Sequence, residues 1–186
     1  MTNSDNAPVL NRHVTLVGLM GVGKTTIGRR LARRLNADFA DADEEVERAA
    51  GRSVSEIFAD FGEAAFRDGE RKVIARLLEE PAPMIIGLGG GAFINEETRA
   101  LIKAQAISVW LKADLEVLVE RVSRKPGARP LLAQGAPAEI MARLESERSP
   151  IYAQADIVVD TSVGSHEQSA DQVLDALAQY QDSYAR

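Results

Sequence analysis

The chain has 186 residues and no cysteine, and its 22 basic and 28 acidic residues give a formal net charge of -6. A hydrophobic content of 45% at this length is typical of one soluble globular domain. The lack of cysteine excludes disulfides and cysteine-ligated metal sites, and the acidic balance disfavours nucleic-acid binding, which requires a positive excess.

The first segment, residues 1–11, is polar and has neither the basic nor the apolar stretch of a secretory signal. We expect a disordered N-terminal tail there, before a single domain over residues 12–180. No apolar run in the sequence reaches the roughly 20 residues that a membrane-spanning helix needs. We therefore predict a cytoplasmic protein without a membrane or nucleic-acid partner, and we expect it to be a monomer.

Beyond the tail, short apolar runs alternate with helical patterns. The runs, which we predict to be strands, lie at residues 14–17, around Phe39, and at 84–88, 107–111 and 157–159. Apolar residues at i, i+4 and i+8 predict amphipathic helices between them, as over residues 27–35, and a further helix should begin near Glu63 and end before Pro81. Continuous apolar runs are typical of parallel strands covered on both faces. The sequence therefore predicts an α/β domain with a five-stranded parallel sheet in three α/β/α layers.

The strongest motif follows the first predicted strand, where Gly18 to Thr25 fit the pattern G-x-x-x-x-G-K-[ST]. In such a loop the backbone N–H groups converge on phosphate oxygens, and glycine leaves room for that approach. Lys24 supplies a charge to the β- and γ-phosphates, Thr25 offers a hydroxyl to Mg²⁺, and the following helix adds its N-terminal dipole. A chance glycine-rich turn is the alternative. We predict that a nucleoside triphosphate binds at Gly21, Val22, Gly23, Lys24, Thr25 and Thr26.

Two carboxylates, Asp41 and Asp43, follow the second predicted strand. On an extended exit from a strand, side chains at i and i+2 point the same way. One carboxylate could then approach Mg²⁺ through water while the other contacts a substrate hydroxyl. The alternative is a helix N-cap beside a solvated loop charge.

Three glycines, Gly89 to Gly91, come directly after the third predicted strand. They leave room for a ligand against the backbone, although a plain turn is the alternative. Glu63, Arg67 and Glu70 follow the spacing i, i+4, i+7, which by itself is equally typical of a surface salt-bridge ladder.

Taken together, these residues resemble the shikimate kinase family. The matching pieces run in the family's order over about residues 12 to 180: Gly18–Thr25, Phe39–Asp43, Gly51–Phe58, Gly62–Arg67, Gly89–Gly91, Arg129–Leu132 and Glu147–Tyr152. Many NTPases share the phosphate loop. Its combination with the Asp-x-Asp, Phe-Arg, triple-glycine and Arg-Pro-Leu-Leu elements is far more specific.

The resemblance implies a nucleoside-monophosphate-kinase-like P-loop fold, with a helical substrate-binding segment over about residues 44–72 and a mobile lid over about 123–134. It implies transfer of the γ-phosphate of ATP to the 3-hydroxyl of shikimate, a step in the biosynthesis of aromatic amino acids. Shikimate would be bound by Asp43, Phe58, Phe66, Arg67, Gly89, Gly90, Gly91 and Arg148. Lys24, Asp43 and Arg129 would be catalytic, Arg124 and Arg129 would bind ATP with Arg124 near the adenine, and Thr25 directly and Asp41 through water would hold Mg²⁺.

The chemistry of shikimate accounts for these residue types. A carboxylated polyol needs planar cations for its carboxylate, from Arg67 and Arg148, and a carboxylate for its hydroxyls, from Asp43. Glu63 and Glu70 would then orient Arg67. Two stretches depart from the family: residues 124–129 form a short lid, and residues 161–166 lack an obvious adenine-binding signature, which leaves the base contacts unassigned.

Three alternatives stay open at this point. A kinase for another small acid or polyol, such as gluconate, would use the same phosphate loop. A nucleotide kinase fits less well, because the sequence has no Asp-Gly-Phe-Pro-Arg motif. An NTP-binding regulatory module with a vestigial acceptor site would bind ATP without transferring phosphate.

Overall fold

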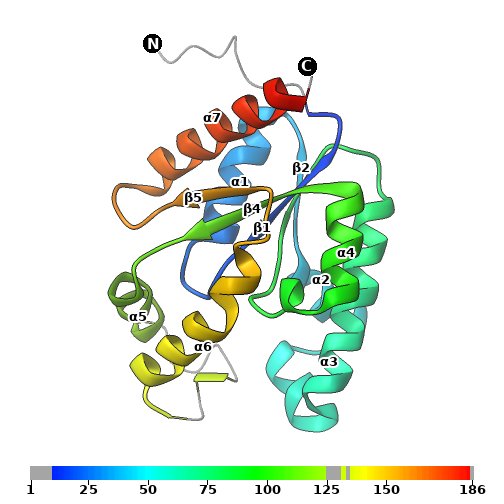
Figure 1. The fold of residues 1–186 in the computed structure, drawn as a ribbon. Helices are drawn as coiled ribbons and strands as arrows, with labels where there is room; N and C mark the ends of the chain where they lie inside the picture. The colour runs from blue at the N-terminus through cyan, green and yellow to red at the C-terminus, as the bar shows by residue number, and fades with distance from the viewer. Residues whose placement is uncertain (1–9, 125–130, 133–134, 185–186) are drawn as a thin grey trace.

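The computed structural model describes residues 10–124, 131–132 and 135–184. At its centre is a sheet in which five strands run parallel to one another in the order β2-β3-β1-β4-β5 (Figure 1). The strands are β1 (His13–Val17), β2 (Asp38–Asp41), β3 (Met84–Gly87), β4 (Ala106–Lys112) and β5 (Ile157–Asp160). The predicted five-stranded parallel sheet is confirmed.

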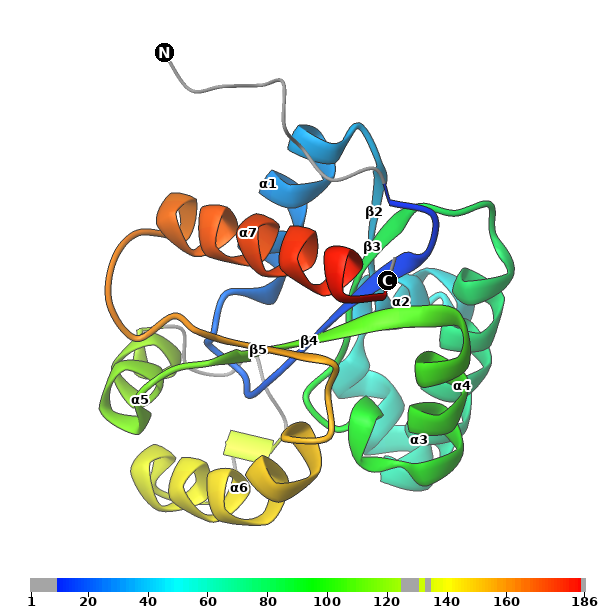
Figure 2. The same cartoon turned by 45° about the horizontal axis from the view of Figure 1, so that its top comes forward.

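Helices cover both faces of this sheet. They are α1 (Lys24–Leu35), α2 (Ala42–Ala50), α3 (Val54–Glu79), α4 (Glu96–Gln105), α5 (Leu115–Ser123), α6 (Pro137–Tyr152) and α7 (His166–Tyr184), with a short 3-10 helix, η2 (Ala92–Ile94). Helices α1 and α7 pack together on one face, whereas α3 and α4 pack together on the other (Figure 1 and Figure 2). This arrangement confirms the predicted three layers.

The central strands are buried because both of their faces are covered. Every residue of β1 is buried, as is β4 up to its last residue. The edge strand β5 instead alternates buried and exposed residues, and Val158 is exposed. Leu10, within the segment predicted to be a tail, is buried with the core just before β1.

Helices α2 and α3 make up the segment expected to bind the substrate. Helix α3 begins at a capping box, in which Ser53 Oγ accepts a hydrogen bond from Glu56 N–H and the Glu56 carboxylate accepts one from Ser53 N–H. The helix predicted to begin near Glu63 is the second half of α3, after a kink at Gly62, where φ is 80°. The first half was not predicted from its apolar spacing.

Most of the predicted lid lies outside the described residues. These undescribed residues are 125–130 and 133–134, and they include Arg129, so the lid and its mobility stay predictions. Leu131 and Leu132 are described and pack against the core. Among the helices that are described, none combines the length and the apolar composition needed to cross a membrane.

Candidate active site

The phosphate loop joins the end of β1 to the start of α1. Gly21 and Gly23 have φ values of 84° and 98°, in the left-handed region that other residues disfavour. Gly23 is the N-cap of α1 and has no side chain to accept from the first N–H groups of the helix. The Lys24 ammonium donates hydrogen bonds to the carbonyl oxygens of Gly18 and Leu19 at 2.8 and 3.0 Å. The loop thus offers an anion both backbone N–H groups and the positive end of a helix.

Asp41 links this loop to the next element of the site. Thr25 Oγ1 donates a hydrogen bond to Asp41 Oδ2 at 2.6 Å, and Asp43 N–H donates one to Asp41 Oδ1 at 3.1 Å. Asp41 is therefore the N-cap of α2 and also a neighbour of the threonine expected to meet Mg²⁺. The N-cap interpretation is confirmed for Asp41, and its contact with Mg²⁺ through water stays a prediction.

Asp43 lies in the first turn of α2 and not on an extended exit from β2, because the Asp41 cap starts the helix directly after the strand. Its Oδ1 is buried and has no hydrogen-bond partner among the described residues. Burial, followed by the carboxylates of Glu70 and Asp41, raises the pKa of Asp43 to about 6. The cations Lys24 and Arg67 oppose this rise in pKa. A buried, unpaired acceptor of this kind is available to a hydroxyl of a ligand.

Arg67 is held by two carboxylates of its own helix, α3. Its guanidinium donates hydrogen bonds to Glu70 Oε2 at 2.8 Å and to Glu63 Oε1 at 3.2 Å, so the expected orientation of Arg67 by these residues is present. Only 2% of Glu70 is exposed, and its Oε1 has no partner among the residues that the structure describes. Burial raises the pKa of Glu70, and Arg67 opposes this rise.

The first glycine after β3 lies against the two buried carboxylates. A Cβ atom at Gly89 would lie 2.5 Å from Glu70 Oε1 and 2.7 Å from Asp43 Oδ1. Both oxygens are the unpaired ones. Any side chain here would therefore displace the acceptors that give the site its polarity.

The next two glycines lie against the two arginines. A Cβ atom at Gly90 would lie 3.0 Å from an Nη atom of Arg148, and one at Gly91 would lie 2.5 Å from Cζ of Arg67. Neither glycine has a positive φ. Glycine is needed here for room, which favours a ligand site over a plain turn.

These side chains surround a cavity of about 250 Å³. Pockets that bind drug-sized ligands have volumes of roughly 300–1,000 Å³, so this smaller cavity suits a small metabolite. Every residue predicted to bind the acceptor lines it: Asp43, Phe58, Phe66, Arg67, Gly89, Gly90, Gly91 and Arg148. Phe58 and Phe66 form an aromatic wall, with ring centroids 4.9 Å apart.

Other residues line the cavity that were not predicted to bind the acceptor. They are Met20, Glu44, Glu47, Val54, Ser55 and Leu131. A signal for some of them was present, because Glu47 lies one helical turn beyond Asp43 and therefore shares its face of α2. Leu131 belongs to the Arg-Pro-Leu-Leu motif, and it brings the far end of the predicted lid segment to the cavity.

The two arginines predicted to bind ATP are not brought together with the phosphate loop in the described residues. Arg124 is exposed at the end of α5, where it pairs with Glu120, and its contact with the adenine stays a prediction. Arg129 lies outside the described part of the chain. His166, to which the sequence assigned no role, lies beside the phosphate loop, since a Cβ atom at Gly23 would lie 2.8 Å from its Nε2.

Comparison with known proteins gives one answer. Residues 20–178 match the family model for shikimate kinase. Shikimate kinase from Caulobacter vibrioides is 54% identical over 179 residues, which are 96% of this chain and 88% of that protein. The structure of shikimate kinase from Acinetobacter baumannii in complex with shikimate is similar at a TM-score of 0.87 and 32% identity, over 92% of this chain and 95% of that one. A gluconokinase from Sinorhizobium meliloti shares the fold alone, with a TM-score of 0.67 at 16% identity over 95% of this chain and 98% of that one. The chain therefore belongs to the shikimate kinase family.

Proposed function

We propose that this protein transfers the γ-phosphoryl group of ATP to the 3-hydroxyl of shikimate, giving shikimate 3-phosphate and ADP. The observation that carries the proposal is the acceptor cavity, which Asp43, Arg67 and Arg148 line together. A carboxylated polyol requires this set, because guanidinium groups bind a carboxylate in bidentate fashion and a carboxylate accepts hydrogen bonds from hydroxyls. Membership of the family supports the proposal, and the Acinetobacter baumannii relative is described in complex with shikimate.

On the acceptor side, we assign Arg67 and Arg148 to the carboxylate of shikimate. Glu70 holds Arg67 at 2.8 Å, so the planar fork is oriented before the substrate arrives, which reduces the entropy lost on binding. Phe58 and Phe66 would pack against the carbon ring of the substrate. The backbone N–H groups of the glycine run can reach its oxygens because no Cβ atom intervenes.

Asp43 is the residue that we assign to the reacting hydroxyl. In this mechanism the hydroxyl oxygen attacks the γ-phosphorus, the bond to the β,γ-bridging oxygen breaks, and the hydroxyl proton passes to Asp43. The pKa of Asp43, raised by burial to about 6, makes it a stronger base than an exposed aspartate while leaving it ionised at neutral pH.

ATP and Mg²⁺ are assigned to the phosphate loop and its neighbours. The described residues contain no cluster of three or more metal-ligating side chains, but Mg²⁺ is usually held by one or two protein oxygens together with phosphate oxygens and water. Thr25 Oγ1 and Asp41 Oδ2, 2.6 Å apart, are hard oxygen donors that fit this ion. When bound, Mg²⁺ would neutralise charge on the β- and γ-phosphates. Lys24 would exchange its carbonyl contacts for the same phosphates.

The test is coupled ADP release with shikimate, gluconate and quinate as acceptors. We expect rapid, Mg²⁺-dependent release with shikimate alone. Equal rates with gluconate would refute the substrate assignment, and ATP binding without any acceptor response would indicate a regulatory module. Lys24→Met should abolish the activity, whereas Lys103→Met, an exposed lysine of α4, should retain it and so exclude a contaminating kinase.

A monomeric state and a cytoplasmic location stay predictions from the sequence. Light scattering on the purified protein measures the first, and fractionation of the source cells measures the second.

A further inference from the structure

We propose that Tyr152 is a positioning residue of the acceptor site, whose hydroxyl joins the Arg148 guanidinium to the Gly90 carbonyl and holds both groups in place for the substrate. This inference rests on the proposed function, because it concerns how the same cavity receives shikimate. Tyr152 was part of a motif in the sequence, but its residue type alone indicated no role.

The contacts of Tyr152 connect two parts of the cavity wall. Tyr152 is the last residue of α6, one helical turn after Arg148, so the two side chains share a face of the helix. Its hydroxyl donates a hydrogen bond to the carbonyl oxygen of Gly90. The hydroxyl and the Arg148 guanidinium both lie beside Gly90, since a Cβ atom there would be 3.7 Å from Tyr152 Oη and 3.0 Å from an Nη atom of Arg148. A phenol can donate one hydrogen bond and accept another at the same time. The hydroxyl therefore ties a side chain of α6 to the backbone of the glycine run.

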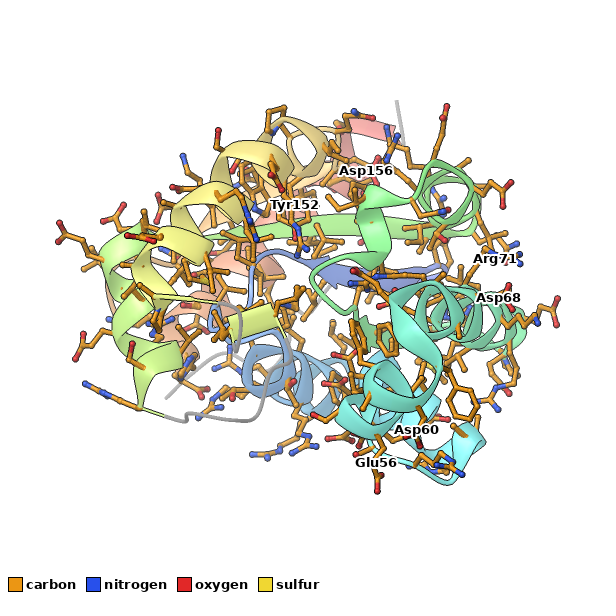
Figure 3. The ribbon with its side chains drawn as sticks, turned by 90° about the horizontal axis from the view of Figure 1, so that it is seen from below. Glu56, Asp60, Asp68, Arg71, Tyr152 and Asp156 are labelled. Carbon is orange, nitrogen blue, oxygen red and sulfur yellow. The ribbon has the colours of Figure 1, made fainter. Side chains whose placement is uncertain are left out.

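The ring of Tyr152 is fixed by its surroundings. Only 1% of the residue is exposed, and its ring packs against that of Trp110 on β4, with centroids 5.9 Å apart. Figure 3 shows Tyr152 on α6, well away from Glu56 and Asp60 at the tip of α3. Burial raises the pKa of the Tyr152 phenol, so the hydroxyl keeps its proton and remains a donor at neutral pH.

The hydrogen bond to Gly90 has a consequence for the next N–H group. The peptide between Gly90 and Gly91 is trans, so its C=O and N–H point in opposite directions. Tyr152 holds the carbonyl toward α6 and thereby directs the N–H of Gly91 away from α6. Both glycines line the cavity, and within the described residues the Gly91 N–H has no protein acceptor. A substrate oxygen is the partner that this N–H lacks.

Loss of the hydroxyl should therefore disturb substrate binding at two points. The peptide after Gly90 would be free to rotate, and Arg148 would lose the neighbour that fixes its guanidinium. Neither effect removes a group that is assigned to ATP, so ATP binding should be spared.

Tyr152→Phe tests this role, because it keeps the ring against Trp110 and removes the hydroxyl alone. Tyr180→Phe, which removes a hydroxyl from α7, is the matched control. Steady-state kinetics give the KM for each substrate and kcat. Trp110 is the only tryptophan in the chain, so the change of its fluorescence during a shikimate titration gives the affinity directly.

We expect Tyr152→Phe to raise the KM for shikimate about 10-fold, equivalent to about 1.4 kcal/mol, with kcat and the KM for ATP within about twofold of wild type. In a double-mutant cycle with Arg148→Lys the two effects should be less than multiplicative, because they remove parts of one unit. A wild-type shikimate KM in Tyr152→Phe, whatever its melting temperature, would overturn the inference, and so would fully multiplicative effects. If the wild-type enzyme itself did not phosphorylate shikimate, the proposed function would fail instead.

Discussion

Asp43 holds a carboxylate at a place where the fold disfavours its charge, and this has a measurable effect on stability. Burial raises its pKa from 3.8 to about 6 in the folded chain, with Glu70 and Asp41 adding to the rise. A carboxyl group with a raised folded pKa stabilises the fold below its unfolded pKa, and that contribution is lost as the pH rises through the folded value. Above pH 6 the charged Asp43 is therefore a cost to the folded state. Asp43→Asn should remove this cost, because an amide never carries the charge.

The magnitude follows from the pKa. A rise from 3.8 to about 6 corresponds to about 3 kcal/mol, at 1.36 kcal/mol per pH unit. For a chain of this length, each kcal/mol shifts the melting temperature by roughly 2–4 °C. The asparagine variant should therefore melt up to about 6–12 °C above the wild type at pH 8. An amide N–H at this position would also face Glu70 Oε1, which has no partner among the described residues.

The assay is thermal unfolding of the ligand-free enzyme between pH 4 and pH 8. The gain in melting temperature for Asp43→Asn should be largest at pH 8 and should shrink steadily as the pH falls through 6 toward 4, where the wild-type carboxyl is protonated in the folded chain and about half ionised in the unfolded chain. Asp68→Asn is the control, because Lys72 and Arg71 lower the pKa of that exposed carboxyl and its loss should give no gain. A melting temperature at or below the wild type at pH 8 would refute the reasoning. The same variant should lose kcat by roughly 10²-fold, so that stability and activity change in opposite directions.

Three further predictions concern the cavity and the lid. Arg67→Lys and Arg148→Lys keep the charge but lose the planar fork, so each should raise the KM for shikimate by a factor equivalent to about 1–3 kcal/mol, at unchanged ATP affinity. A wild-type KM in both variants would show that Arg67 only forms a surface salt-bridge ladder and that Arg148 is only a cation near a helix end. Gly89→Ala should weaken shikimate binding at least about 10-fold, because its Cβ would meet the two buried carboxylates, whereas Gly69→Ala, with open space at that position, should bind normally. Arg129→Ala should lower kcat by roughly 10³-fold with little change in shikimate affinity, if this arginine of the predicted lid meets the transferring phosphate only on closure; a kcat within threefold of wild type would exclude that role.

The fold could be predicted from the sequence because four of its strands carry an apolar run, whereas β2, with the sequence Asp-Phe-Ala-Asp, was marked by Phe39 alone. β1 and β4 are covered on both faces, so nearly all of their residues are buried and most are apolar. The first half of α3 was missed although Val54, Ile57, Phe58 and Phe61 follow the helical spacing i, i+3, i+4, i+7. The helix was expected to begin after Gly62, which interrupts it, and the capping box at Ser53 that marks its true start was not used. Local chemistry at the ends of helices therefore has to be considered beside hydrophobic spacing.

The acceptor site could be predicted as a set of residues but not as a set of contacts. The spacing of Glu63, Arg67 and Glu70 is the same for a solvated ladder and for an oriented guanidinium. Only the fold decides between them, by burying Glu70 to 2% exposure beneath the glycine run. Tyr152 was missed for the same reason, because its partner, Gly90, lies on another element and no local spacing connects the two.

Asp41 shows why cap and metal neighbour need not be alternatives. A carboxylate has two oxygens and about four lone-pair directions, and here Oδ1 accepts from the N–H of Asp43 while Oδ2 accepts from Thr25. The side chain that starts α2 is thus the one that touches the threonine assigned to Mg²⁺. Because α2 carries Asp43 in its first turn, one aspartate sets the position of the assigned base relative to the phosphate loop. The N-cap of α2 therefore fixes where Asp43, the base assigned to the acceptor, lies relative to the phosphate loop that is assigned to ATP.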